Sequence, residues 1–184
     1  DLDHLERMVS FIQQHQARLV AIGEVGLDFS LARQPEERAL QVTVFNRLIE
    51  LAGQLDLPLN VHSRAAAEET VDLLFQQNAR RVQLHAYHGK HNTAQRAVEA
   101  GYFFSIPASV VRSGQLQELA AKLPLSQLML ESDAPVMSPV PGERNEPANI
   151  GAAIDTLARI KGEPRLSVAE ILYNNTVCLY GDRF

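Results

Sequence analysis

Short apolar runs alternate with amphipathic stretches along the whole chain, and this alternation limits the possible folds more than any other feature. Buried strands read as such runs, and apolar residues at helical spacing indicate helices between them. Strands that alternate with helices favour parallel pairing through right-handed crossovers. We predict strands over 18–25, 58–63, 81–87, 102–106 and 127–133, and helices over 2–16, 34–55, 65–77, 92–100, 115–122, 149–161 and 167–180.

Five parallel strands do not close a barrel, because the (β/α)8 fold needs eight strands and about 250 residues. An open α/β sheet and an incomplete barrel are therefore both compatible with the strand count. The 184 residues contain no internal repeat and no linker, so we expect one domain over 1–184. The chain starts at Asp1 inside a helical pattern, which suggests an N-terminally truncated product. Ser167 followed by Glu170 also predicts a capping box for the last helix.

Four of the predicted strands carry a carboxylate or an imidazole at or near their carboxyl ends. These residues are Glu24, His62, His85 and Asp133. Chemistry in barrels is usually located at this end of the strands. One carboxylate with two imidazoles is a suitable set for Zn²⁺, Mn²⁺ or a similar ion. The pattern therefore predicts divalent metal ions and hydrolysis, with Asp133 and Glu24 as the catalytic carboxylates.

Further polar residues near the strand ends have two possible roles each. Arg64 follows His62 by two residues, where a guanidinium suits a phosphate oxygen, with a surface ion pair as the alternative. Arg112 and Asn145 lie in predicted loops after strand ends and are candidate substrate contacts. Glu131 is either a hydrogen-bonding partner of a ligand or a polar core residue. Asp28 is interpreted as a turn residue rather than a ligand.

The composition limits the partners and the setting of the protein. A net charge of −5 and a pI near 5.7 argue against a broad basic surface that wraps nucleic acid. They leave a nuclease possible, because metal ions can supply positive charge locally. The single cysteine, Cys178, excludes an internal disulfide and is expected to be buried. Without a membrane-spanning run, we expect a cytoplasmic or nuclear protein and no membrane partner.

Four ordered segments resemble the TatD-type deoxyribonucleases, a branch of the metal-dependent amidohydrolase superfamily. They are Gly-Glu-Val-Gly-Leu-Asp at 23–28, Asn-Val-His-Ser-Arg at 60–64, Leu-His-Ala-Tyr at 84–87 and Glu-Ser-Asp-Ala-Pro at 131–135. The resemblance runs from the first residue to Asn-Asn-Thr at 174–176, and segments 101–107 and 144–147 are most similar to one human member. Four motifs in order are far more specific than one.

The resemblance implies a TIM-type barrel with two divalent ions (Mg, Mn or Zn) and a deoxyribonuclease of the 3′-to-5′ exonuclease type. By position, Glu24 would bridge the ions, His62 and His85 would hold one of them, and Asp133 would hold the other and act as the base. Arg64 would face the phosphate of a DNA end or single strand. A monomer is the expected oligomeric state.

One departure from the family pattern affects these expectations. Members begin with a His-x-His strand, whereas the first histidine here is His4, on a predicted helix. One ion then keeps three protein ligands and the other only Glu24 and Asp133. We therefore expect an incomplete barrel of about five of eight strands, with impaired activity. The alternatives are a non-catalytic module and a hydrolase of a small ester or amide.

Overall fold

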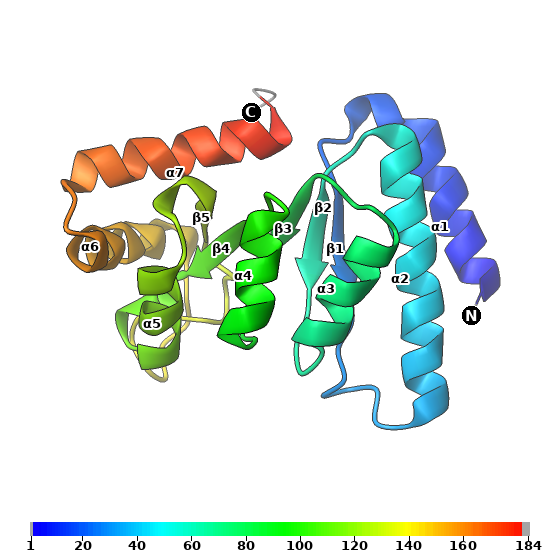
Figure 1. The fold of residues 1–184 in the computed structure, drawn as a ribbon, viewed down its shortest axis with the longest axis horizontal. Helices are drawn as coiled ribbons and strands as arrows, with labels where there is room; N and C mark the ends of the chain where they lie inside the picture. Colours follow the sequence, from blue (N-terminus) through cyan, green and yellow to red (C-terminus); the bar gives the residue numbers. More distant parts are fainter. Residues whose placement is uncertain (1, 182–184) are drawn as a thin grey trace.

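The computed structural model describes residues 2–181, and a five-stranded parallel sheet forms its centre (Figure 1). The strands follow one another in chain order without closing into a ring, which confirms five parallel strands and an incomplete barrel. Each neighbour pair is parallel, with His62 opposite Gly26 and Leu84 opposite both Val61 and Phe104. The strands are β1 (Ile22–Gly26), β2 (Leu59–His62), β3 (Val82–Leu84), β4 (Phe103–Pro107) and β5 (Leu128–Glu131).

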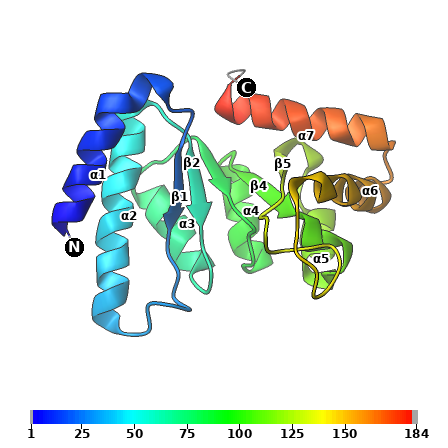
Figure 2. The ribbon, with the colours of Figure 1, turned by 180° about the vertical axis from the view of Figure 1, so that it is seen from behind.

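Within residues 2–181, seven α-helices connect and flank these strands. In Figure 1 helices α2 to α5 follow one face of the sheet, and in Figure 2 the strands lie nearer the viewer than α3 and α4. Helix α7 runs past the amino ends of the strands, away from their carboxyl ends. The helices are α1 (Leu2–His15), α2 (Pro35–Leu55), α3 (Ala67–Gln76), α4 (His91–Glu99), α5 (Gly114–Lys122), α6 (Ile150–Lys161) and α7 (Arg165–Tyr180). Within 2–181, none of them has the length and apolarity needed to cross a bilayer.

Alternation along the strands separates an apolar core from a polar inner face. Leu59, Val61, Val82, Leu84 and Phe104 are buried in the hydrophobic core. The residues between them point the opposite way because successive strand side chains alternate between faces. Asn60 and His62 of β2, Gln83 of β3 and Ser105 of β4 therefore share the inner face of the curved sheet. This polar face leads toward the carboxyl ends of the strands.

The predicted elements are all present, although several boundaries differ. β1 starts at Ile22 instead of Arg18, because residues 16–18 form a 3-10 turn. The capping box predicted for the last helix is wrong, since α7 already begins at Arg165 after Pro164. A capping box instead starts α2, where Gln34 and Glu37 satisfy each other's backbone N–H groups.

The expected burial of Cys178 is also wrong, because the thiol lies on the exposed side of α7. The buried positions of this helix are Val168, Leu172, Asn175 and Leu179. Their spacing of three and four residues defines one stripe, and Cys178 falls outside it. The apolar residues next to Cys178 in the sequence did not reveal its exposure, because polar and apolar residues are mixed around α7.

Candidate metal centre

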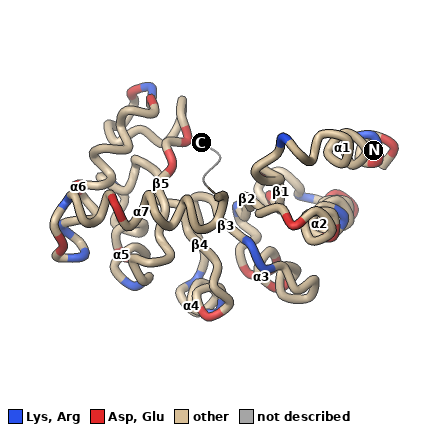
Figure 3. Tube along the Cα trace, turned by 90° about the horizontal axis from the view of Figure 1, so that it is seen from above, with Lys and Arg blue, Asp and Glu red and all other residues tan. Residues whose placement is uncertain are grey.

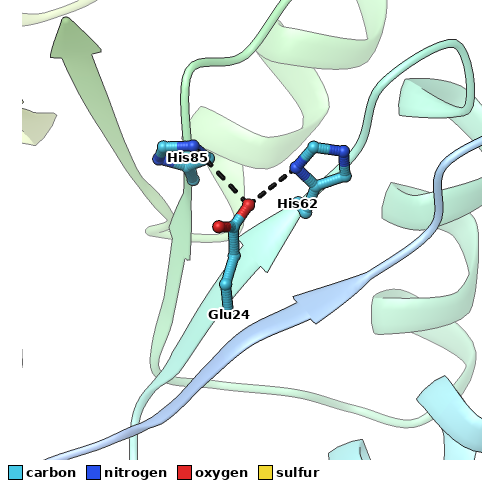
Figure 4. Close-up of side chains that lie close together, drawn as sticks. All are labelled: Glu24, His62 and His85. Carbon is cyan, nitrogen blue, oxygen red and sulfur yellow. Dashed lines mark hydrogen bonds and ion pairs between the residues drawn. The ribbon is translucent and has the colours of Figure 1, made fainter. Parts of the chain in front are cut away.

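The carboxyl ends of β1, β2 and β3 bring Glu24, His62 and His85 to one place (Figure 4). Parallel strands end at the same edge of a sheet, so side chains far apart in sequence meet there. One ligand atom from each residue lies within 4.8 Å of the other two. His62 Nδ1 is 2.6 Å from Glu24 Oε1, and His85 Nε2 is 3.6 Å from the same oxygen. Figure 4 shows both imidazoles pointing at the Glu24 carboxylate.

Asp133 joins this group from the loop after β5. Its Oδ1 lies 3.6 Å from His85 Nε2, the nitrogen that faces Glu24. The backbone of Asp133 has a φ of 55°, a left-handed conformation that is uncommon for a residue with a side chain. A turn holds this geometry, because the Val136 N–H donates to the Asp133 carbonyl. The four residues predicted to form one site thus lie together.

A second carboxylate lies behind each imidazole. Asp28 Oδ2 is 3.1 Å from His62 Nε2, and Glu131 Oε2 is 2.6 Å from His85 Nδ1. The Ala86 N–H donates to the other Glu131 oxygen at 3.0 Å. In protein metal sites such partners fix the orientation and tautomer of a ligating histidine. The nitrogens left toward the centre are Nδ1 of His62 and Nε2 of His85.

The electrostatics of this centre favour a positive charge between the carboxylates. Burial by itself lowers the pKa of His85, but the Glu131 hydrogen bond and the charges of Glu131, Glu24 and Asp133 raise it to about 9. Burial likewise raises the pKa of Asp28, yet hydrogen bonds from Arg64, Ser30 and His62 hold it well below its usual range. Carboxylates gathered around His85 favour a positive charge there and suit a divalent cation, and oxygen and imidazole donors fit Zn²⁺ or Mn²⁺.

Arg64 forms the ion pair that was the alternative interpretation of this residue. Its Nε and Nη2 donate to Asp28 Oδ2 at 2.9 and 2.6 Å, while 60% of the side chain stays exposed. It borders a cavity of about 280 Å³ at the strand ends. The other lining residues are His62, Ser63, His85, Ala86, His88, Asp133 and Met137. Arg64 thus orients Asp28 and also lies beside the open space.

Arg112 and Asn145 are placed differently from the expected substrate contacts. Asn145 is only 3% exposed, and its amide donates to the Ser132 carbonyl at 2.5 Å. Its side-chain oxygen accepts from the Glu146 N–H, so this residue anchors the loop and has no open face for substrate. Arg112 is exposed, but its Nε donates to the Ser138 carbonyl of the same loop. Both residues hold the loop that carries Asp133.

The sequence interpretation gave too small a role to Asp28. The expected turn is present, because the Ser30 N–H donates to Asp28 Oδ1 at 3.0 Å, but the second oxygen holds His62 and Arg64. The sequence signal that could have indicated this role is the position of Asp28, four residues after Glu24. Glu131 takes the first of its two predicted roles, as the hydrogen-bonding partner of His85.

The open parallel sheet, with carboxylates and imidazoles gathered at the carboxyl ends of its strands, defines the class of the fold as an incomplete TIM-type barrel. The sequence model of the family described as TatD related DNase matches residues 1–181, and the chain belongs to this family. The predicted resemblance is therefore confirmed. The human "Deoxyribonuclease TATDN3" is 44% identical over 181 residues, which are 97% of this chain and 66% of that protein. The chain spans under two thirds of the human relative, and 62% of a mouse relative that is 45% identical.

Solved structures show the same fold. A TatD homologue from Escherichia coli, YjjV, superimposes with a TM-score of 0.86 at 30% identity, over 96% of this chain and 69% of that one. A hydrolase TatD family protein from Entamoeba histolytica gives a TM-score of 0.83 at 19% identity, over 96% and 68% of the two chains. The chain therefore corresponds to about two thirds of each of these folds.

Proposed function

We propose that the protein is a metal-dependent deoxyribonuclease that hydrolyses phosphodiester bonds at the centre formed by Glu24, His62 and His85. The convergence of one carboxylate and two imidazoles on a common point carries this proposal. Family membership supports it, because the human relative is named a deoxyribonuclease and the Escherichia coli relative a metal-dependent hydrolase. The same centre supports metal dependence.

Glu24, His62 and His85 would hold one divalent ion, and Glu24 with Asp133 would hold a second. Ions at these positions would supply Lewis-acid charge to activate water and to stabilise the phosphoryl oxygens. The chain's own contribution is orientation. Asp28 and Glu131 hold the two imidazoles from behind, so that His62 Nδ1 and His85 Nε2 face Glu24. Rotation of either ring would remove its ligand nitrogen from the centre.

Asp133 and Arg64 are proposed to act on the substrate side. Asp133 is partly exposed at the cavity and lies beside the centre, so its carboxylate is positioned to take a proton from an attacking water. Arg64 borders the same cavity, and a guanidinium there suits a phosphate oxygen. The Asp28 ion pair fixes the direction of Arg64 before substrate arrives.

The proposed substrate is a DNA end or a single strand, cleaved in the 3′-to-5′ direction. Figure 3 shows basic and acidic positions interspersed over the helices, rather than a continuous basic track. With a net charge of −5, affinity for a long duplex must be small, because such binding depends on many Lys and Arg contacts to phosphate. A compact cavity at the strand ends favours attack on one terminal phosphate at a time.

The test compares Glu24→Gln with Glu163→Gln, an exposed acidic residue after α6. Purified protein is dialysed against Mn²⁺ or Zn²⁺, and metal content is measured with cleavage of single-stranded oligonucleotides labelled at either end. We expect Glu24→Gln to lose bound metal and at least 100-fold of the cleavage rate, because it removes a charged ligand. Equal metal content and equal cleavage in both variants would overturn the proposal.

A second candidate is a catalytically weak or inactive module. It is favoured by the ligand count, since among residues 2–181 the second ion has only Glu24 and Asp133 as proposed ligands. One bound ion per chain without cleavage of DNA would support this candidate. Turnover of small phosphate esters, carboxylate esters or amides without cleavage of DNA would support a hydrolase of small substrates instead.

A further inference from the structure

A row of polar side chains crosses the inner face of the sheet from the end of α7 to His85. The Tyr180 hydroxyl contacts Gln83 Oε1, and Gln83 Nε2 lies 2.7 Å from Ser105 Oγ. Ser105 Oγ contacts Glu131 Oε2, which lies 2.6 Å from His85 Nδ1. Gln83 is 6% exposed and Ser105 is fully buried, so water cannot readily replace these partners.

The chemistry of the four partners allows only one direction of hydrogen bonding. A carboxylate has only acceptors, so the Ser105 hydroxyl donates to Glu131. Ser105 Oγ then accepts from the Gln83 amide, whose carbonyl oxygen is left facing the Tyr180 hydroxyl. Tyr180 must donate, and burial together with the Glu131 charge raises its pKa to about 12, so the phenol keeps its proton.

The row of donors ends at Glu131, and His85 must therefore present an N–H to it from Nδ1. In the neutral ring His85 Nε2 is then the nitrogen with a free lone pair, and it lies 3.6 Å from both Glu24 Oε1 and Asp133 Oδ1. We infer that Tyr180, Gln83 and Ser105 are positioning residues that act through Glu131 to hold His85 in the Nδ1–H form. This inference rests on the proposed function for its purpose, since a cation at Nε2 requires that form.

The row also connects distant parts of the chain. Tyr180 and Gln83 are 97 residues apart, and Tyr180 is the last residue of α7. Arg81 holds the same helix end, because its Nη2 donates to the Leu179 carbonyl at 2.6 Å. The amino ends of the strands are thereby linked to the centre at their carboxyl ends. A simple filling of polar space would not require the donors to be aligned toward one carboxylate.

The test uses Tyr180→Phe and Ser105→Ala, with Tyr102→Phe as the matched control. Tyr102 is also a buried tyrosine, but its hydroxyl donates to the Ala79 carbonyl at 2.9 Å, outside the row. Long-range ¹H–¹⁵N NMR reads the His85 ring in metal-free protein at pH 10 and in Zn²⁺-loaded protein at pH 7.5. Titration with Co²⁺, followed by visible absorption, gives metal affinity and ligand geometry. Urea unfolding reports stability in parallel.

We expect both variants to show a mixed tautomer at His85 and a Co²⁺ affinity reduced about 3- to 10-fold, since partners behind a ligating histidine tune its affinity. Tyr102→Phe should lose stability alone. If both variants keep the Nδ1–H form and wild-type Co²⁺ affinity, the inference is wrong. If Ser105→Ala does not fold, Tyr180→Phe decides. Wild-type protein that binds no Co²⁺ would overturn the proposed function. The tautomer of His85, measured in the metal-free variants, would still decide whether the row has a positioning role.

Discussion

Each imidazole of the centre lies between an inner carboxylate that faces the cation position and an outer one that orients the ring. For His62 the outer partner is Asp28, and for His85 it is Glu131. The two rings expose different nitrogens because their outer partners contact different nitrogens. Such an arrangement places the ligands before any metal arrives, which is the condition for a preorganised site.

Gly26 shows how closely the backbone is packed around this centre. Its φ is 145°, and an added Cβ would lie 2.0 Å from the His62 carbonyl oxygen. We expect Gly26→Ala to cost roughly 2–4 kcal/mol of unfolding free energy and to displace His62. Gly53→Ala is the control, because nothing lies within 4 Å of a Cβ there and alanine favours the interior of α2.

Urea unfolding and metal content check both variants. Gly53→Ala should gain roughly 0.5–1 kcal/mol, since alanine has the higher helix propensity. A Gly26→Ala variant with wild-type stability and full metal content would show that β1 shifts freely against β2 and that the backbone is not tightly packed at this position.

Buried Tyr102 gives the protein a dependence on alkaline pH. Burial raises its pKa from 10.0 to about 12, because the folded state disfavours the phenolate. Below pH 10 this group favours folding fully, and its contribution is lost as the pH rises from 10 toward 12. At pH 11 the loss is about 1 kcal/mol. We expect wild-type protein to lose more unfolding free energy between pH 9 and 11 than Tyr102→Phe does, as measured by urea unfolding. Equal losses in the two proteins would contradict the raised pKa of Tyr102.

At the scale of elements, the sequence was sufficient for the order and type of the strands and helices. Apolar runs marked the strands, and His62 and His85 at their carboxyl ends were predicted to belong to one site. The boundaries were less predictable, since the 3-10 turn at 16–18 replaces the expected start of β1. Strand register, which sequence does not show, brings Glu131 to His85 across 46 residues and Asp28 to His62 across 34.

The loop after β5 is held by Asn145. Sequence could not predict this role, because it depends on contacts between residues that are ten or more positions apart. The side-chain amide of Asn145 donates to the Ser132 carbonyl, and its backbone N–H donates to the Pro135 carbonyl. We expect Asn145→Ala to cost about 1–3 kcal/mol, since buried partners lose their hydrogen bonds. Asp133 should then be held less firmly.

Hydrogen exchange over 132–146 and DNA cleavage measure this effect together. Asn145→Ala should exchange faster in that segment and cleave at least tenfold more slowly, while the ion held by Glu24, His62 and His85 is retained. Asn92→Ala, at an exposed position of α4, is the control and should leave both unchanged. Loss of the metal instead would mean that Asn145 supports the whole centre and not the loop alone.

At the scale of the whole molecule, the sheet is open and β1 is one of its edges. Edge strands carry backbone groups that can pair further, and apolar surface beside them favours association. An apolar cavity of about 510 Å³ lies here between α1 and β1, lined among others by Leu5, Met8, Phe11 and Val25. The cavity is next to the candidate metal centre, because Glu24 also lines it.

The apolar groove predicts binding of the hydrophobic dye ANS to the folded protein. Phe11 and Met8 contribute exposed side chains on α1, so the double variant Met8→Lys with Phe11→Lys should lower ANS fluorescence by roughly half or more. Its stability should change by less than about 0.5 kcal/mol, because exposed positions tolerate substitution. Leu166→Lys removes a single exposed leucine on α7 and should leave the fluorescence unchanged. An equal decrease in both variants would show that the dye reports general surface apolarity, and the groove would then have no special role in association.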